Sequence, residues 1–117
     1  MSYVDGFLLA VPTARLEEYR VLARQAGEVW REHGAISYVE ALADDVPYGE
    51  LTSFPRAVQA TEDETVVFAF ITYPSREDRD RINAAVFADP RLSKDMESLP
   101  FDASRMIYGG FRAIVEL

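Results

Sequence analysis

The side chains that could do acid–base or binding chemistry gather in one stretch, WREHGAISYVEALADD, which runs from Trp30 to Asp45. It holds the only tryptophan and the only histidine of the chain. An imidazole can serve as a general base or an axial haem ligand, and a glutamate beside a tyrosine can pair a proton acceptor with a hydrogen-bond donor. The sequence assigns no catalytic residue. The candidate pocket or binding residues are Trp30, His33, Tyr38, Glu40, Asp44, Asp45 and, outside this stretch, Arg56.

Each of these candidates also has a structural interpretation. His33 follows Trp30 by three residues at the end of a predicted helix, where an imidazole interacts favourably with the negative end of the helix dipole. Trp30 is typical of a core or interface aromatic, whose N–H then needs a partner. Glu40 falls on a predicted edge strand, where a charge discourages pairing with other chains. The sharper alternative places Glu40 and Tyr38 together in a cavity.

Asp44 and Asp45 precede a valine–proline pair, a pattern typical of a turn in which aspartate bonds its own backbone. Adjacent carboxylates could hold a hard cation, but no calcium-loop spacing follows them, and the chain has no cysteine. We therefore expect no metal site and no cofactor. Arg56, a natural carboxylate clamp, lies in the long irregular connection 44–64. Connections of this length are usually functional, so we expect this one first to serve assembly and second to close a pocket.

The chain has 117 residues, 49% of them hydrophobic, which is typical of one globular domain spanning residues 1–117. Its net charge of −8 and its scattered cations argue against a nucleic-acid partner, which requires a basic patch. The first residues have no basic region before an apolar run, and no run approaches the roughly 20 residues that span a bilayer. We expect a cytoplasmic protein with neither a nucleic-acid nor a membrane partner.

Hydrophobic periodicity predicts elements in the order β-α-β-β-α-β. Thr13 is expected to cap the first helix, Gly34 to end it, and Ser75 to open the second in a capping box with Asp78. The charged run SREDRDRINA is typical of a solvated helix face. Two crossover helices on one face of an antiparallel sheet form the ferredoxin-like arrangement, an α+β fold. The predicted strands are 2–11, 35–43, a half-strand at 56–60, 65–73 and 105–117, and the predicted helices are 13–33, 75–89 and a short turn within 91–100.

Apolar side chains project from both faces of the predicted strands. In the strand 65–73, for example, Phe68 and Phe70 point to one face while Ala69 and Ile71 point to the other. Two helices cover only one face, so the second face would expose a larger apolar patch than monomers usually tolerate. We predict that a second copy packs on it about a two-fold axis, giving a homodimer that closes an α/β barrel. The alternative is that the long connection before this strand folds back over the sheet.

Four segments, YVDGFLLAVP, WREHGAISYVEALADDV, TSFPRAV and FDASRMIYGGF, occur in this order over nearly the whole chain. Together they resemble the YbaA-type bacterial proteins. The resemblance implies a dimeric α/β-barrel fold and implies no established activity, so no catalytic residue is carried over from it. The wider superfamily contains haem-degrading and cofactor-free monooxygenases and lactone isomerases, which is a likeness of fold and only weakly suggests chemistry.

Three functions are compatible with these observations, and whether the protein is an enzyme stays open. The first is a homodimer that binds a small organic ligand between the sheet and the helices. The second is a cofactor-independent monooxygenase or isomerase that uses His33 or Glu40 as a base and Tyr38 or Arg56 to orient the substrate. The third is a structural or interaction protein that takes no small ligand.

Overall fold

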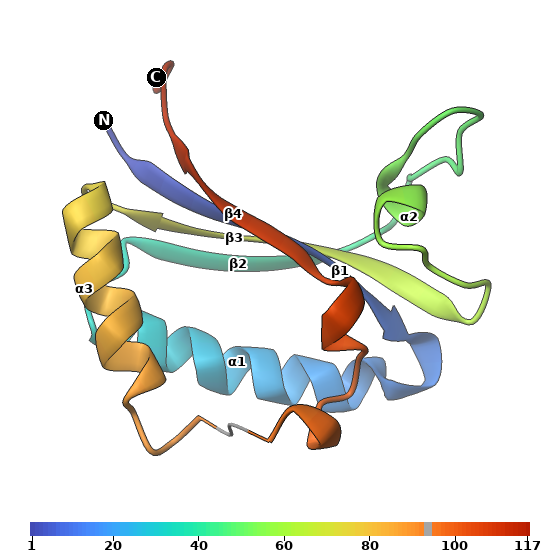
Figure 1. Ribbon diagram of the computed structural model, residues 1–117, viewed down its shortest axis with the longest axis horizontal. Helices are drawn as coiled ribbons and strands as arrows, with labels where there is room; N and C mark the ends of the chain where they lie inside the picture. Colours follow the sequence, from blue (N-terminus) through green and yellow to red (C-terminus); the bar gives the residue numbers. More distant parts are fainter. Residues whose placement is uncertain (93–94) are drawn as a thin grey trace.

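The computed structural model describes residues 1–92 and 95–117 (Figure 1). Its strands are β1 Tyr3–Pro12, β2 Ser37–Leu42, β3 Glu64–Tyr73 and β4 Ile107–Arg112. Its helices are α1 Leu16–Glu32, α2 Phe54–Ala57 and α3 Arg76–Phe87, with 3₁₀ turns η1 Thr13–Arg15, η2 Met96–Ser98 and η3 Ala103–Arg105. The turn predicted within 91–100 corresponds to η2, and residues 93 and 94 of that segment lie outside the described residues.

The strands form an antiparallel sheet in the order β2-β3-β1-β4, with β2 and β4 at its edges. The two long helices, α1 and α3, lie on one face of this sheet, and the short helix α2 lies on the other (Figure 1). This α+β arrangement is compatible with the predicted ferredoxin-like fold. None of the described helices has the length and apolarity that crossing a bilayer requires.

The start of α1 lies later in the chain than predicted, and Thr13 does not cap it. The Thr13 N–H donates to the Asp63 carbonyl at 2.8 Å, and its hydroxyl pairs with the Thr65 hydroxyl at 2.9 Å. Because these contacts continue the pairing of β1 with β3, the chain first forms η1, and no side chain caps α1. The predicted end of the helix is confirmed, since His33 is the C-cap and Gly34 follows with a φ of +119°.

Ser75 is the N-cap of α3, as predicted, and Asp78 contacts it through the Ser75 hydroxyl. Ser75 Oγ accepts a hydrogen bond from the Asp78 N–H at 3.1 Å and donates to the Asp78 carboxylate, also at 3.1 Å. Ile82 and Val86 of the same helix are fully buried. The solvated face predicted for this charged segment is wrong at one position, because Arg79 turns inward and its side chain is only 21% exposed.

The core fills the space between the sheet and the two long helices. Odd-numbered residues of β1 and β3 face this space, as the period of two in a strand predicts. One cluster packs α3 and the end of α1 on the sheet and contains Val29, Ala35, Ile71, Tyr73, Ile82 and Val86. A second cluster packs the first half of α1 on β1 and β3 and contains Leu9, Val11, Tyr19, Ala23 and Val67.

The connection between β2 and β3 covers one end of the second sheet face. The half-strand predicted at 56–60 is wrong, because Ser53 Oγ accepts the Arg56 N–H at 3.1 Å and Pro55 lies in the first turn, which together favour the helix α2. Directly after α2, Val58 is 1% exposed and packs on Leu8, Ala10 and Val66. The alternative in which this connection folds back over the sheet is therefore correct for one end of the face.

The remainder of the second face stays open to solvent. Phe54, Phe68 and Phe111 are 50%, 46% and 64% exposed, and Phe54 meets Phe68 edge-on with ring centres 6.1 Å apart. Ile107 of β4 and Val39 of β2 add further exposed apolar surface. We call these five residues the open-face patch.

The last strand is shorter than the predicted 105–117. β4 ends at Arg112, which lies opposite Tyr3, the first residue of β1. Before β4, the chain forms η3, and there Arg105 pairs with Glu64 at 2.6 Å. This guanidinium lowers the pKa of Glu64 to about 2. The ion pair thus ties the segment before β4 to the start of β3.

Candidate functional site

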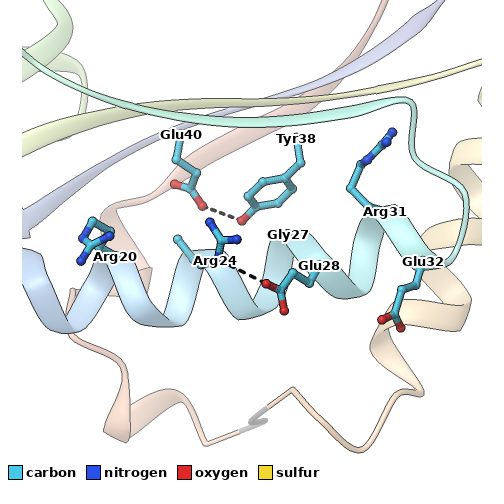
Figure 2. A pocket seen from close by; sticks show the side chains of 9 residues that line it. Arg20, Arg24, Gly27, Glu28, Arg31, Glu32, Tyr38 and Glu40 are labelled. Carbon is cyan, nitrogen blue, oxygen red and sulfur yellow. Dashed lines mark hydrogen bonds and ion pairs between the residues drawn. The ribbon is translucent and has the colours of Figure 1, made fainter.

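A groove runs between α1 and the edge strand β2, on the helix-covered side of the sheet (Figure 2). Its cavity volume is about 520 Å³. Tyr38 and Glu40 of β2 both point toward α1, because alternate residues of a strand face the same way. α1 contributes residues spaced by three and four positions, and these are Arg20, Ala23, Arg24, Gly27, Glu28 and Arg31.

Glu40 is the centre of hydrogen bonding in the groove. One of its carboxylate oxygens accepts the Tyr38 hydroxyl at 2.5 Å, and the other accepts the Tyr19 hydroxyl at 2.5 Å. Burial raises the pKa of both phenols, and the nearby charge of Glu40 raises it further. Both tyrosines are therefore neutral donors at physiological pH. The structure brings Tyr38 and Glu40 together and adds Tyr19 of α1, which was not a candidate from the sequence.

Gly27 allows Tyr38 to lie against α1. A Cβ at residue 27 would be 2.6 Å from Cδ1 of the Tyr38 ring, which is closer than van der Waals contact permits. A glycine inside a helix is about 1 kcal/mol less favourable than an alanine. The close approach of the Tyr38 ring explains why residue 27 is a glycine. In the sequence, a glycine inside the predicted helix was the available indication that another group lies against the helix there.

Charges of both signs form the rim of the groove. Arg24 pairs with Glu28 at 3.3 Å, and both side chains are mostly exposed. Arg31 donates to the carbonyl oxygens of Ala35 and Ile36, which ties it to the start of β2. Exposed ion pairs contribute at most about 1 kcal/mol, so an anionic ligand group can compete for Arg24.

Trp30 and His33 do not line this groove. The Trp30 indole N–H donates to Asn83 Oδ1 at 3.0 Å, and its ring centre lies 6.0 Å from that of Tyr38. His33 Nε2 lies 3.1 Å from Asp89 Oδ2, which joins the end of α1 to the end of α3. Both residues thus have partners in the fold itself, which favours their structural interpretation.

Asp44, Asp45 and Arg56 do not line the groove either. The two aspartates are exposed beyond the end of β2. Arg56 donates to the carbonyl oxygens of Tyr48 and Gly49 at 3.0 Å each, and its guanidinium lies 3.9 Å from the centre of the Tyr48 ring. It holds the connection before β3 in shape. Within residues 1–92 and 95–117, no three His, Asp or Glu side chains gather in a way that could hold a metal ion.

A second polar cluster is buried beneath β1 and was not a candidate from the sequence. Asp5 is 4% exposed, accepts the Tyr73 hydroxyl at 2.9 Å and pairs with the Arg79 guanidinium at 3.0 Å. Asn83 Oδ1 accepts from Tyr73 at 3.2 Å and from Trp30, which connects α1 and α3 to the cluster. The available signal was a carboxylate at a core-facing position of an otherwise apolar strand.

Comparison with known proteins identifies the relatives of this chain. The family described as "Protein of unknown function (DUF1428)" matches residues 2–103. The chain is 49% identical over 116 residues to "Uncharacterized protein YbaA" of Escherichia coli strain K12, with 99% of each chain covered. The proteins of the same description from Escherichia coli O157:H7 and Shigella flexneri are similar to the same extent. These matches confirm the resemblance predicted from the four segments, and the chain belongs to the DUF1428 family, with the YbaA proteins as relatives.

Proposed function

We propose that this chain is a single-domain homodimer that binds a small organic ligand in the groove between α1 and β2. The observation that carries the proposal is the Glu40 carboxylate, which holds the hydroxyls of Tyr19 and Tyr38 inside an accessible groove. A half-buried carboxylate that faces a core needs partners, and the two phenols supply them. The result is a rigid polar centre beside the face of α1 that carries Ala23 and Gly27.

The groove favours a ligand with two kinds of group. A carboxylate has about four acceptor positions, so Glu40 keeps acceptor capacity for a hydroxyl or amine of the ligand after both phenols have bonded. The Tyr38 ring, which covers Gly27, is the apolar part of the lining and suits a flat apolar body. Arg24 at the rim suits a carboxylate on the same ligand. A small hydroxy acid combines these features.

The geometry supports binding better than it supports catalysis. The two phenols fix Glu40 as a hydrogen-bond acceptor, which is the role that ligand binding requires of it. His33, the other base considered for a monooxygenase or isomerase, faces Asp89 and does not line the groove. We therefore prefer a binding protein to the enzymatic alternative.

The ligand proposal predicts that Glu40→Gln weakens binding at least tenfold, because the amide replaces a charged acceptor and turns one donor against the phenols. The measurement is a thermal-shift screen of small hydroxy acids, quinones and haem on the wild type, followed by calorimetric titration of any compound that stabilises it. His33→Ala is the matched control and should bind as the wild type does. A compound bound equally by the Glu40→Gln protein would place its site elsewhere, and a screen without stabilising compounds would count against ligand binding.

The open-face patch supports the homodimer. Three phenyl rings, each about half exposed, present roughly 300 Å² of aromatic surface before their neighbours are counted. A stable interface buries about 800 Å² from each partner around such an apolar centre. Four of the five patch residues belong to the sheet and Phe54 belongs to α2, and a second copy of the same surface can pack on the patch about a two-fold axis. Sheets packed in this way, with the helices outside, would form the α/β barrel that the family resemblance implies.

We expect the wild type to sediment as a dimer at micromolar concentration and Phe111→Lys to sediment as a monomer. The lysine would leave a charge without a partner in the interface. Val21→Lys is the control, because Val21 is equally exposed at 63% but lies on α1. Sedimentation velocity distinguishes the two species. A wild type that is monomeric at this concentration, or a Phe111→Lys protein that stays dimeric, would contradict the proposed interface.

A further inference from the structure

A second cavity lies at the opposite edge of the sheet from the α1–β2 groove. It is formed where β1 begins and β4 ends, next to the first residues of α3, and its volume is about 570 Å³. The two chain ends lie at this end of the sheet (Figure 1). Its lining includes Ser2, Tyr3, Arg76, Gly110 and Arg112, none of which the ligand groove uses.

Two arginines of this cavity have little or no compensation by acids. The Arg112 side chain makes no hydrogen bond or ion pair within the described residues. The carboxylate paired with Arg76 is that of Asp80, at 3.9 Å, which is near the limit of an ion pair. The chain holds 20 acidic side chains against 12 basic ones. A lack of acidic partners in the chain therefore does not explain why these two arginines are poorly paired.

A phenol accompanies the two guanidinium groups. Tyr3 lies directly opposite Arg112 in the β1–β4 pairing, so both side chains are on the helix-facing side of the sheet. Its hydroxyl has no hydrogen-bond partner in residues 1–92 and 95–117. Gly110 makes room for it, since a Cβ at residue 110 would collide with the Tyr3 hydroxyl and lie 2.7 Å from Arg79 Nη2. The hydroxyl is therefore available to a ligand.

Two acidic side chains near the cavity, those of Asp5 and Glu116, are already engaged. Asp5 is paired with Arg79 at 3.0 Å. Glu116 accepts from the Ser2 N–H at 2.8 Å and from the Ser2 hydroxyl at 2.5 Å. The N–H of Asp78 at the start of α3 is bonded to Ser75. Among the polar side chains that line the cavity, those of Arg76, Arg112 and Tyr3 remain for a ligand.

We propose that this cavity binds an oxyanion, either free phosphate or the carboxylate of a small acid, through Arg112 and Arg76 with a hydrogen bond from the Tyr3 hydroxyl. A guanidinium offers two parallel N–H donors that match the spacing of two oxygens in a phosphate or carboxylate. The site is separate from the α1–β2 groove, so it can be present whether or not that groove binds a ligand. It shares Phe111 with the open-face patch, so it borders the proposed dimer interface.

The test is a calorimetric titration of the full chain with sodium phosphate and with sodium acetate, against sodium chloride at matched ionic strength. We expect saturable binding of at least one oxyanion, weakened tenfold or more by Arg112→Gln and severalfold by Tyr3→Phe. Binding of phosphate without acetate would identify free phosphate as the ligand class, and the reverse would identify a carboxylate.

Arg24→Gln is the matched control, because it removes an exposed arginine of the other groove and should leave oxyanion binding unchanged. Arg112 has no partner to lose, so Arg112→Gln should unfold at the same temperature as the wild type. Equal binding by the wild type and Arg112→Gln, equal weakening by Arg24→Gln, or no saturable binding of either oxyanion would overturn the proposal.

Discussion

Replacing Asp5 with alanine is expected to lower the free energy of unfolding by about 3–5 kcal/mol, because it strips one partner from a buried ion pair. Arg79 would keep its charge in a site where its side chain is only 21% exposed. The Tyr73 hydroxyl would lose its 2.9 Å acceptor in the core. Urea unfolding followed by far-ultraviolet circular dichroism measures this loss of free energy. In thermal unfolding the same loss would lower the midpoint temperature by roughly 10–20 °C.

Asp80→Ala is the control for this prediction. Asp80 also pairs with Arg79, at 2.8 Å, but its side chain is 58% exposed, so its removal should cost less than about 1 kcal/mol. The double variant Asp5→Leu with Arg79→Met should recover much of the stability, because no charge is then left buried. If Asp5→Ala were no more destabilising than Asp80→Ala, the buried cluster would not hold β1 and α3 together.

Replacing Gly27 with alanine is expected to destabilise the protein by about 1–3 kcal/mol, although the same change in an ordinary helix stabilises it by about 1 kcal/mol. The reversal follows from the Tyr38 ring, whose Cδ1 would lie 2.6 Å from the new methyl group. Moving the ring would also stretch its 2.5 Å hydrogen bond to Glu40. The free energy of unfolding of each variant in urea gives the sign directly.

A double-mutant cycle separates the ring from the helix. In a Tyr38→Ala background the obstacle is gone, so Gly27→Ala should recover its ordinary benefit and become stabilising. The change of sign between the two backgrounds is the expected result. A Gly27→Ala variant that is stabilised with Tyr38 in place would mean that the ring does not press on α1 and that the groove is wider than described.

The order of the elements could be predicted from periodicity because each element has a buried face. The period of two in β2 correctly placed Tyr38 and Glu40 on one side, and the capping residues of α3 were local signals. The errors arose where tertiary contacts override local ones. Thr13 continues the pairing of β1 with β3. Residues 56 and 57 end the helix α2, and Val58 directly after them packs on the sheet.

Most of the candidate site depends on contacts between residues that are distant in the chain. Tyr19 meets Glu40 across 21 positions, and Asp5 meets Arg79 across 74. No pattern within one element can show which side chain of α1 reaches a strand, or which arginine of a charged helix turns inward. For His33, the position at the end of a helix could be predicted from the local sequence. Its partner Asp89, at the end of the other long helix, could not.

The way Val58 docks on Leu8, Ala10 and Val66 has a consequence for assembly. The connection before β3 covers one end of this sheet face. In the proposed homodimer, a second sheet could therefore pack on the face only as far as α2. This steric limit would favour one alignment of the two sheets relative to each other. In the proposed homodimer, a change in the length of this connection would then shift which residues of the two copies face each other, while the fold of each copy stayed the same.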